Sequence, residues 1–126
     1  AILAILMAIA IPAYQDYAVR ARVAEGVAAT APAKLAISET ASSLGGLGSV
    51  TPANSGYTFP GATSYVQTVA LSGTGTTIQI DVTTQNTGAG TCTFQMNPTD
   101  VGTGQLNWEC TPTDCDTVYL PAECRE

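Results

Sequence analysis

Residues 1–17 have the sequence AILAILMAIAIPAYQDY, the most apolar part of the chain. No charged side chain precedes Asp16, and Ala and Leu, which are strong helix formers, are frequent. A helix that is apolar on all sides is stable only in lipid or among other helices. The stretch therefore predicts a helix that is buried by a membrane or by other protein helices.

The helical pattern continues over residues 18–44, where it becomes amphipathic. Asp16 and Arg20, and likewise Arg22 and Glu25, are spaced so that each pair can meet on one helix face. Apolar residues recur at helical spacing at Val19, Val23, Val27, Ala31, Leu35 and, less regularly, Ala41. We expect this row to pack on the rest of the protein.

Pro12 and Pro32 lie inside the helical pattern, where each removes a backbone donor. The pattern resumes directly after each proline, so we expect one kinked helix over 1–44 rather than two separate helices. Its apolar part, 1–17, is the candidate membrane or assembly segment, and its amphipathic part is 18–44.

The apolar run is shorter than the roughly 18–20 residues that a bilayer span needs. It also lacks the basic start and the small-residue cleavage site of a complete signal peptide. We expect it to be the end of a longer apolar segment that extends upstream of Ala1.

The chain is acidic, with 4 Lys and Arg against 10 Asp and Glu. This balance argues against binding to nucleic acid or to anionic lipid head groups, which needs a basic surface. The carboxylates near the end are interpreted as a solvated acidic rim: Glu109, Asp114, Asp116, Glu123 and Glu126.

A Gly-, Pro- and Ser-rich stretch at 45–63 predicts a long surface loop that contains no more than one short element. Its apolar residues are candidate packing anchors: Leu47, Val50, Tyr57 and Phe59. The loop connects the helix to a predicted globular β-sheet domain at 64–126.

Four strands separated by turn signals are predicted within that sheet domain: Tyr65–Leu71, Thr77–Val82, Thr91–Met96 and Gln105–Cys110. The short turns favour an antiparallel sheet with one face on the helix, which makes the fold class α+β. A turn at 97–104 sets a register for the last two strands, with pairs Met96–Leu106, Phe94–Trp108 and Cys92–Cys110 on the core face. Residues after Cys110 are expected to form an irregular terminal loop.

All 4 cysteines lie in the last third of a chain that has no His, so two disulfides are more plausible than a zinc site. The lack of His also removes the usual general base and the Ser–His–Asp and Cys–His arrangements. Asp114 and Asp116 flank Cys115, but two carboxylates are too few for calcium. The sequence predicts no metal, no cofactor and no enzymatic activity.

The two ends of the chain resemble type IV pilins. The stretch AILAILMAIAIPAYQDYAVRARVAEG at 1–26 is similar to their N-terminal helix, with Pro12, Tyr14 and Tyr17 matching an Ala-Ile-Pro-x-Tyr-x-x-Tyr pattern. WEC at 108–110 and YLPAEC at 119–124 look like the start and end of the C-terminal disulfide loop of type IVa pilins. The resemblance implies the pilin fold, with a long kinked helix on the sheet and a disulfide-closed C-terminal loop.

The resemblance implies a Cys110–Cys124 disulfide, which leaves Cys92–Cys115 as the second bond. A closed loop of roughly 15 residues stabilises by about 3 kcal/mol in the chain-entropy model. The predicted strand register also allows Cys92–Cys110 with Cys115–Cys124, so both connectivities stay open at this point.

The resemblance further implies a structural subunit of a bacterial type IVa pilus. Such a subunit is anchored in the inner membrane, is polymerised with identical copies by the pilus machinery, and ends in an extracellular fibre for adhesion, twitching motility, DNA uptake or phage adsorption. The residues implied in filament assembly are Ala1, Ile2, Leu3, Ile5, Leu6, Ile9, Ile11, Pro12, Tyr14 and Tyr17.

This sequence departs from the family pattern in some respects. The methylated N-terminal residue and the nearby Glu of the family are not in it, and Ala4 stands where a Gly is usual. A minor pilin or a secretion pseudopilin is the main alternative, although pseudopilins more often stabilise this end with calcium. A DNA-receptor pilin would be expected to carry a basic stripe, which the acidic balance opposes.

Overall fold

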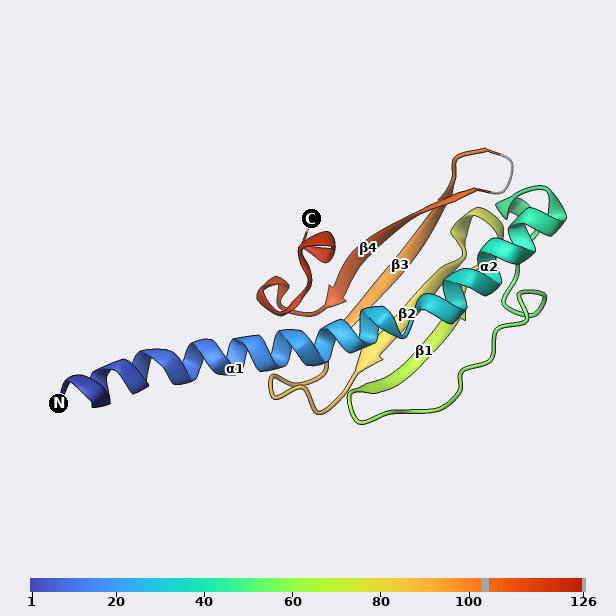
Figure 1. Cartoon of the computed structure of the whole chain (residues 1–126). Helices are drawn as coiled ribbons and strands as arrows, with labels where there is room; N and C mark the ends of the chain where they lie inside the picture. The colour runs from blue at the N-terminus through green and yellow to red at the C-terminus, as the bar shows by residue number, and fades with distance from the viewer. Residues whose placement is uncertain (103–104, 126) are drawn as a thin grey trace.

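The computed structural model describes residues 1–102 and 105–125. Thr103 and Gly104 of the predicted 97–104 turn, and Glu126 of the acidic cluster, lie outside the described residues. A long bent helix packs on an antiparallel sheet, and one end of the helix projects beyond the sheet (Figure 1). The main elements are α1 (Ile2–Ala28), α2 (Ala31–Leu44), β1 (Val66–Ser72), β2 (Gln79–Thr84), β3 (Thr93–Asp100) and β4 (Leu106–Asp114). The predicted α+β fold is confirmed.

The helix bends at Ala29 and Thr30, between α1 and α2, and it continues without a break through Pro12. Pro32 lies in the first turn of α2, where backbone N–H groups have no partner within the helix. A proline there cannot extend α1, because it lacks the donor that would bond to the fourth residue before it. The prediction of one kinked helix is therefore confirmed, with the bend set by Pro32.

The stripe of the helix that faces the sheet differs from the predicted row. Its buried residues are Val19, Val23, Gly26, Thr30, Ala33, Ile37 and Ala41, whereas Ala31 and Leu35 are exposed. A strict i+4 row drifts by about 40° per step around a helix of 3.6 residues per turn. The true stripe combines steps of four with steps of three, which offsets this drift, and it keeps its phase across the bend.

Gly26 lies on this stripe at the closest approach of α1 to the sheet. A Cβ atom at this position would be 2.9 Å from Cγ2 of Thr84 and 3.3 Å from Cγ1 of Val82. Thr84 cannot easily turn away, because its Oγ1 donates to the carbonyl of Cys92 at 3.1 Å and accepts from the Cys92 N–H at 3.1 Å. The missing side chain of Gly26 thus allows the helix to reach β2.

The sheet has the strand order β1-β2-β3-β4, and all neighbours are antiparallel. Burial alternates strictly along β2 and along most of β3, with one face toward the helix. The largest fully buried side chains of this core are Phe94, Ile37, Ile78, Ile80 and Leu120.

The strands lie close to their predicted positions, but the last two are longer than expected. β3 runs through Pro98 to Asp100, so residues predicted to form a turn lie in the strand. Pro98 is tolerated because the pairing of β3 with β2 ends at Met96. β4 likewise extends to Asp114, which corrects the expected irregular segment after Cys110.

The predicted register of β3 and β4 is wrong by four residues. Met96 pairs with Cys110 instead of Leu106, and Phe94 pairs with Pro112 instead of Trp108. A shift by an even number of residues keeps each side chain on the same face of the sheet. Leu106 and Trp108 now lie opposite Asp100 and Pro98, at the end of β3, and they are only partly buried. The cause is the longer β3, which runs to Asp100 and pairs there with Leu106.

The loop after α2 begins at Gly45, whose φ of 80° provides the left-handed turn that ends the helix. It contains one short 3-10 helix, Leu47–Ser49, and the Leu47 N–H donates to Oδ2 of Asp100 at 3.1 Å. Leu47 and Val50 are buried, while Tyr57 and Phe59 pack partly against the core.

We expect Gly26→Ala to destabilise the protein by about 1–2 kcal/mol, because overpacking beside the fixed Thr84 side chain outweighs the gain in helix propensity. Thermal unfolding of the full chain in a mild detergent measures this change. Gly48→Ala is the matched control, because a Cβ there meets no atom within 4 Å, and it should leave the melting temperature nearly unchanged. Equal melting temperatures for the two variants would contradict the close-approach argument.

Candidate assembly site

The N-terminal half of α1 is exposed along its whole length. Every residue from 1 to 17 is exposed, and Ile2 retains 76% of its surface. All residues predicted to act in filament assembly, from Ala1 to Tyr17, lie in this segment. Monomeric soluble proteins rarely expose a continuous apolar surface of this kind, so it is the main candidate for an interaction surface.

Within the described residues, Ile2–Leu44 is the one helix long and apolar enough to cross a membrane, judged by length and composition alone. Its most apolar window is only 6% buried by the rest of the protein. The helix therefore does not use this apolar surface to form the core of its own subunit.

The helix leaves the sheet domain near Arg20, which binds the C-terminal region. Nε and Nη2 of Arg20 both donate to the carbonyl oxygen of Val118, at 3.1 and 3.0 Å. Val118 belongs to a short 3-10 helix, Thr117–Tyr119, in which the Val118 N–H donates to Oδ1 of Asp116. Arg20 thus ties the C-terminal segment to α1.

Arg22 makes the equivalent contact with the segment between β2 and β3. Its Nη1 donates to the carbonyl oxygen of Thr87 at 3.0 Å, and its guanidinium lies 5.3 Å from the ring centroid of Tyr65. Gly88 follows with a φ of 98°, and a Cβ there would be 3.3 Å from Nη1 of Arg22. The backbone comes this close to α1 because residue 88 has no side chain.

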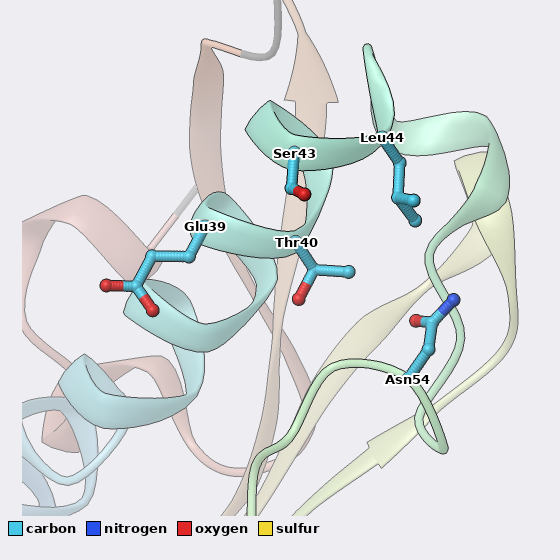
Figure 2. Close-up of a pocket in the computed structure, with 5 residues that line it drawn as sticks. All are labelled: Glu39, Thr40, Ser43, Leu44 and Asn54. Carbon is cyan, nitrogen blue, oxygen red and sulfur yellow. The ribbon is translucent and has the colours of Figure 1, made fainter.

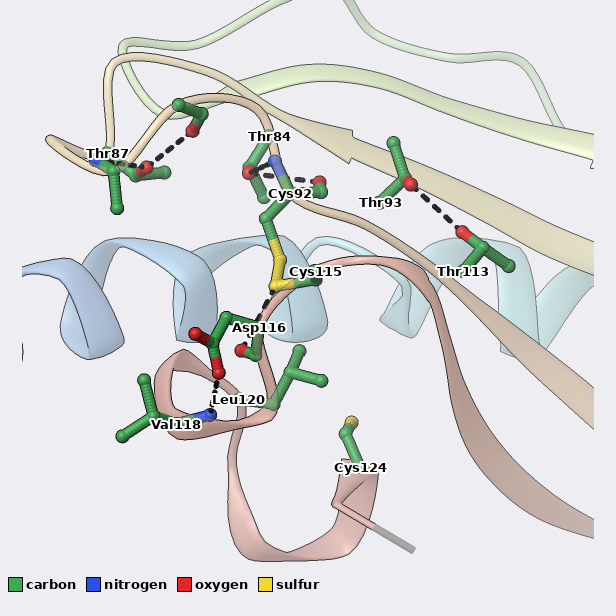
Figure 3. Close-up of a disulfide and its surroundings, with 12 residues drawn as sticks. Thr84, Thr87, Cys92, Thr93, Thr113, Cys115, Asp116, Val118, Leu120 and Cys124 are labelled. Carbon is green, nitrogen blue, oxygen red and sulfur yellow. Dashed lines mark hydrogen bonds between the residues drawn. A yellow bond between two sulfur atoms is a disulfide. The ribbon is translucent and has the colours of Figure 1, made fainter.

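The Cys92–Cys115 disulfide connects these two segments, with the Cα atoms 4.6 Å apart. Figure 3 shows the residues around it: Thr87 and Cys92 in one segment, and Cys115, Asp116 and Val118 in the other. We call Arg20, Arg22 and the disulfide-linked segments 86–92 and 115–120 the collar. The collar holds α1 at the point where the helix leaves the sheet domain.

A family model for pilins, described as a bacterial filament, matches residues 19–125. The chain belongs to the pilin family. The match covers the collar and the sheet domain, and it begins close to where the exposed apolar segment ends. No solved structure matches this pilin.

Membership of the family assigns this pilin to a structural filament rather than to an enzyme class, and it implies assembly into an extracellular fibre of many subunits. The disulfides are Cys92–Cys115 and Cys110–Cys124, the pairing implied by the family resemblance. The four-residue shift in register, together with one extra residue at the irregularity between Thr93 and Phe94, explains why, since Thr93 then pairs with Asp114 and Cys92 lies opposite Cys115 rather than Cys110.

The described part of this pilin contains no group of three or more His, Cys, Asp or Glu side chains that could hold a metal. Oδ1 of Asp116 accepts from the N–H group of Val118, a local role in the 3-10 turn. The two aspartates flanking Cys115 belong to no such group within the described residues.

A polar hollow lies between the end of α2 and the following loop, and Figure 2 shows its lining residues, Glu39, Thr40, Ser43, Leu44 and Asn54. Thr40 Oγ1 donates to the carbonyl of Ala36 at 2.8 Å. Asn54 Nδ2 donates to the carbonyl of Ser49, and its Oδ1 accepts from the Thr51 N–H. The polar atoms of Thr40 and Asn54 form hydrogen bonds with nearby backbone groups, so we propose no ligand for this hollow.

The role of the two arginines could not be inferred from the sequence. Helical spacing predicts that Arg20 meets Asp16 and that Arg22 meets Glu25, but the guanidinium groups bind backbone carbonyls of distant segments. Glu25 instead accepts a hydrogen bond from Thr63 Oγ1 at 3.1 Å. Only the tertiary fold brings those carbonyls to α1.

We expect Arg20→Ala and Arg22→Ala to loosen different halves of the collar. Loss of the Val118 contact should accelerate amide hydrogen exchange at 117–120, and loss of the Thr87 contact should do so at 86–90. Each variant serves as the control for the other. Acceleration of both segments by either variant would show that the arginines do not act on them separately.

Replacing both Cys92 and Cys115 by Ser should lower the free energy of unfolding by about 3 kcal/mol, from the chain-entropy cost of a loop of this size. It should also accelerate exchange in both collar segments, because their covalent connection is lost. The Cys110→Ser and Cys124→Ser pair is the comparison, and it should leave 86–90 protected. Unchanged slow exchange at 86–90 and 117–120 in the Cys92→Ser and Cys115→Ser variant would contradict the role of this disulfide in the collar.

Proposed function

We propose that this pilin is the major structural subunit of a type IVa pilus. In this proposal the segment 1–17 anchors the subunit in the inner membrane, and the assembly machinery then transfers it into the core of a fibre of identical subunits. The fibre serves adhesion, twitching motility, DNA uptake or phage adsorption. The observation that carries the proposal is the apolar half of α1, which the described residues of its own subunit leave exposed.

The energetics of the apolar segment support transfer between two burial sites. Leu and Ile gain roughly 0.3–0.6 kcal/mol per residue at the centre of a membrane. Burial among the same helices of other subunits removes a similar area from water, at about 25 cal/mol per Å². Transfer from lipid to the fibre core then has a small net cost, which suits a subunit that both enters and leaves the membrane.

The charge distribution supports a structural role over that of a DNA receptor. The chain has a formal net charge of −6 and only 4 cationic side chains. Each of these contacts a backbone carbonyl or an aromatic ring: Arg20 with Val118, Arg22 with Thr87 and Tyr65, Lys34 with Trp108, and Arg125 with Leu120. Such commitments leave little basic surface for phosphate groups.

The C-terminal region supports a pilus subunit over a secretion pseudopilin. Two disulfides stabilise this region. The described residues contain no cluster of three or more possible metal ligands of the kind that a calcium site would need. Leu120 and Cys124, both in the loop closed by the Cys110–Cys124 disulfide, are fully buried. The covalent bonds hold the region in shape after the subunit has left the cell.

We expect Leu6→Asp to abolish fibre formation, because a carboxylate on the apolar segment opposes burial among other helices. Fibres sheared from cells and viewed by electron microscopy provide the measurement, with total subunit quantified by immunoblot. Leu35→Asp is a matched control, since Leu35 is 59% exposed and Leu6 is 58% exposed.

The control distinguishes the apolar segment from exposed leucines in general. Fibres should persist with Leu35→Asp and disappear with Leu6→Asp at comparable subunit levels. Normal fibres from Leu6→Asp would contradict the proposed function, as would the absence of any sheared fibre from cells that produce the unmodified subunit.

A further inference from the structure

An apolar hollow lies beside the collar, between α1 and the C-terminal segment. It has a volume of about 300 Å³ and is lined by Tyr17, Arg20, Ala21, Ala24 and Pro121. Consecutive turns of α1 provide most of the lining, and Pro121 follows directly after the collar segment held by Arg20. The hollow therefore exists only because the C-terminal segment is fixed against the helix.

The lining leaves little that could bind a charged or polar ligand. Arg20 contributes the one charge, and its Nε and Nη2 are already directed at the Val118 carbonyl. The same guanidinium lies 5.8 Å from the ring centroid of Tyr17. The alanine methyl groups, the proline ring and the tyrosine ring offer an apolar surface that fits an aliphatic side chain.

The position of the hollow indicates which aliphatic side chain would occupy it. Tyr17 belongs both to the hollow and to the exposed apolar segment, so the two surfaces are continuous along α1. The large exposed hydrophobic side chains of the chain are concentrated in the same segment: Ile2, Leu3, Ile5, Leu6, Met7, Ile9, Ile11, Tyr14 and Tyr17. The chain belongs to a family that forms filaments, and the proposed function places copies of this segment beside one another in the fibre core.

We propose that the hollow receives an aliphatic side chain from the segment Ile2–Ile11 of a second copy of this pilin. The proposal rests on the proposed function and adds to it a specific contact. Pro121 forms one wall, so the disulfide-closed C-terminal loop takes part in subunit contact on its inner side as well as stabilising the sheet domain. Filling the hollow from within the subunit should then compete with assembly.

The first test is Ala24→Leu, which fills the hollow, with Ser42→Leu as the control at an exposed position of α2 away from it. Leu is a good helix former, and the hollow is open, so both subunits should melt within about 1–2 °C of the unmodified protein in detergent. The yield of sheared fibres should fall at least tenfold for Ala24→Leu and stay unchanged for Ser42→Leu. Equal yields would overturn the proposal.

The second test identifies the occupant. Chains carrying Ala24→Cys together with Ile2→Cys, Ile5→Cys or Ile9→Cys are assembled into fibres and mildly oxidised, and covalent multimers are resolved by denaturing electrophoresis. At least one pair should give a ladder of multimers, whereas the same partners combined with Ser42→Cys should give none. Mass spectrometry of the crosslinked peptides checks that the native disulfides are intact.

The outcomes separate this proposal from the proposed function. Fibres that form normally without a ladder from any Ala24→Cys pair would overturn the hollow contact, even if Ala24→Leu lowers the yield, and would leave the pilus role intact. Failure of the unmodified subunit to form fibres would overturn the proposed function and this proposal with it.

Discussion

The close packing of α1 on the sheet determines both the core of this pilin and the surface that stays exposed. Gly26 allows the helix to approach Thr84 and Val82, and Phe94 lies 3.4 Å from where a Cβ would be. Only the second half of the helix takes part, because the buried stripe begins at Val19. Residues 1–17 are left exposed, so the same geometry that builds the core also creates the apolar surface that needs a partner.

The collar deals with the mechanical consequence of that arrangement. Only the second half of α1 is supported by the sheet, so any force on the projecting half acts on the contacts nearest to it. These include the hydrogen bonds from Arg20 and Arg22 to two backbone carbonyls. Such hydrogen bonds are individually modest when exposed. The Cys92–Cys115 disulfide connects the two segments that carry the carbonyls, so a segment that loses its arginine contact is still held close to the other segment.

The sequence predicts the elements of the fold well and their relative placement less well. Helical and strand periodicity are local properties, so the predicted bent helix and strands lie close to their observed bounds. The register of β3 and β4 depends on how far β3 extends, and Pro98 is typical of a turn although it lies here within β3, paired with Trp108 of β4 but beyond the end of the pairing with β2. The contacts of Arg20 and Arg22 join residues far apart in the sequence, so local spacing predicts the wrong partners.

The bend at Ala29 and Thr30 has a consequence for how the sheet domain directs the exposed segment. Because the buried stripe keeps its phase through the bend, α2 and the second half of α1 are held by the same sheet face, from Val19 to Ala41. The bend therefore adds no rotation between the two helical parts. The direction in which the apolar segment leaves the subunit is then set by the sheet and the collar together, and the disulfide-linked segments contribute to the geometry that a neighbouring subunit meets.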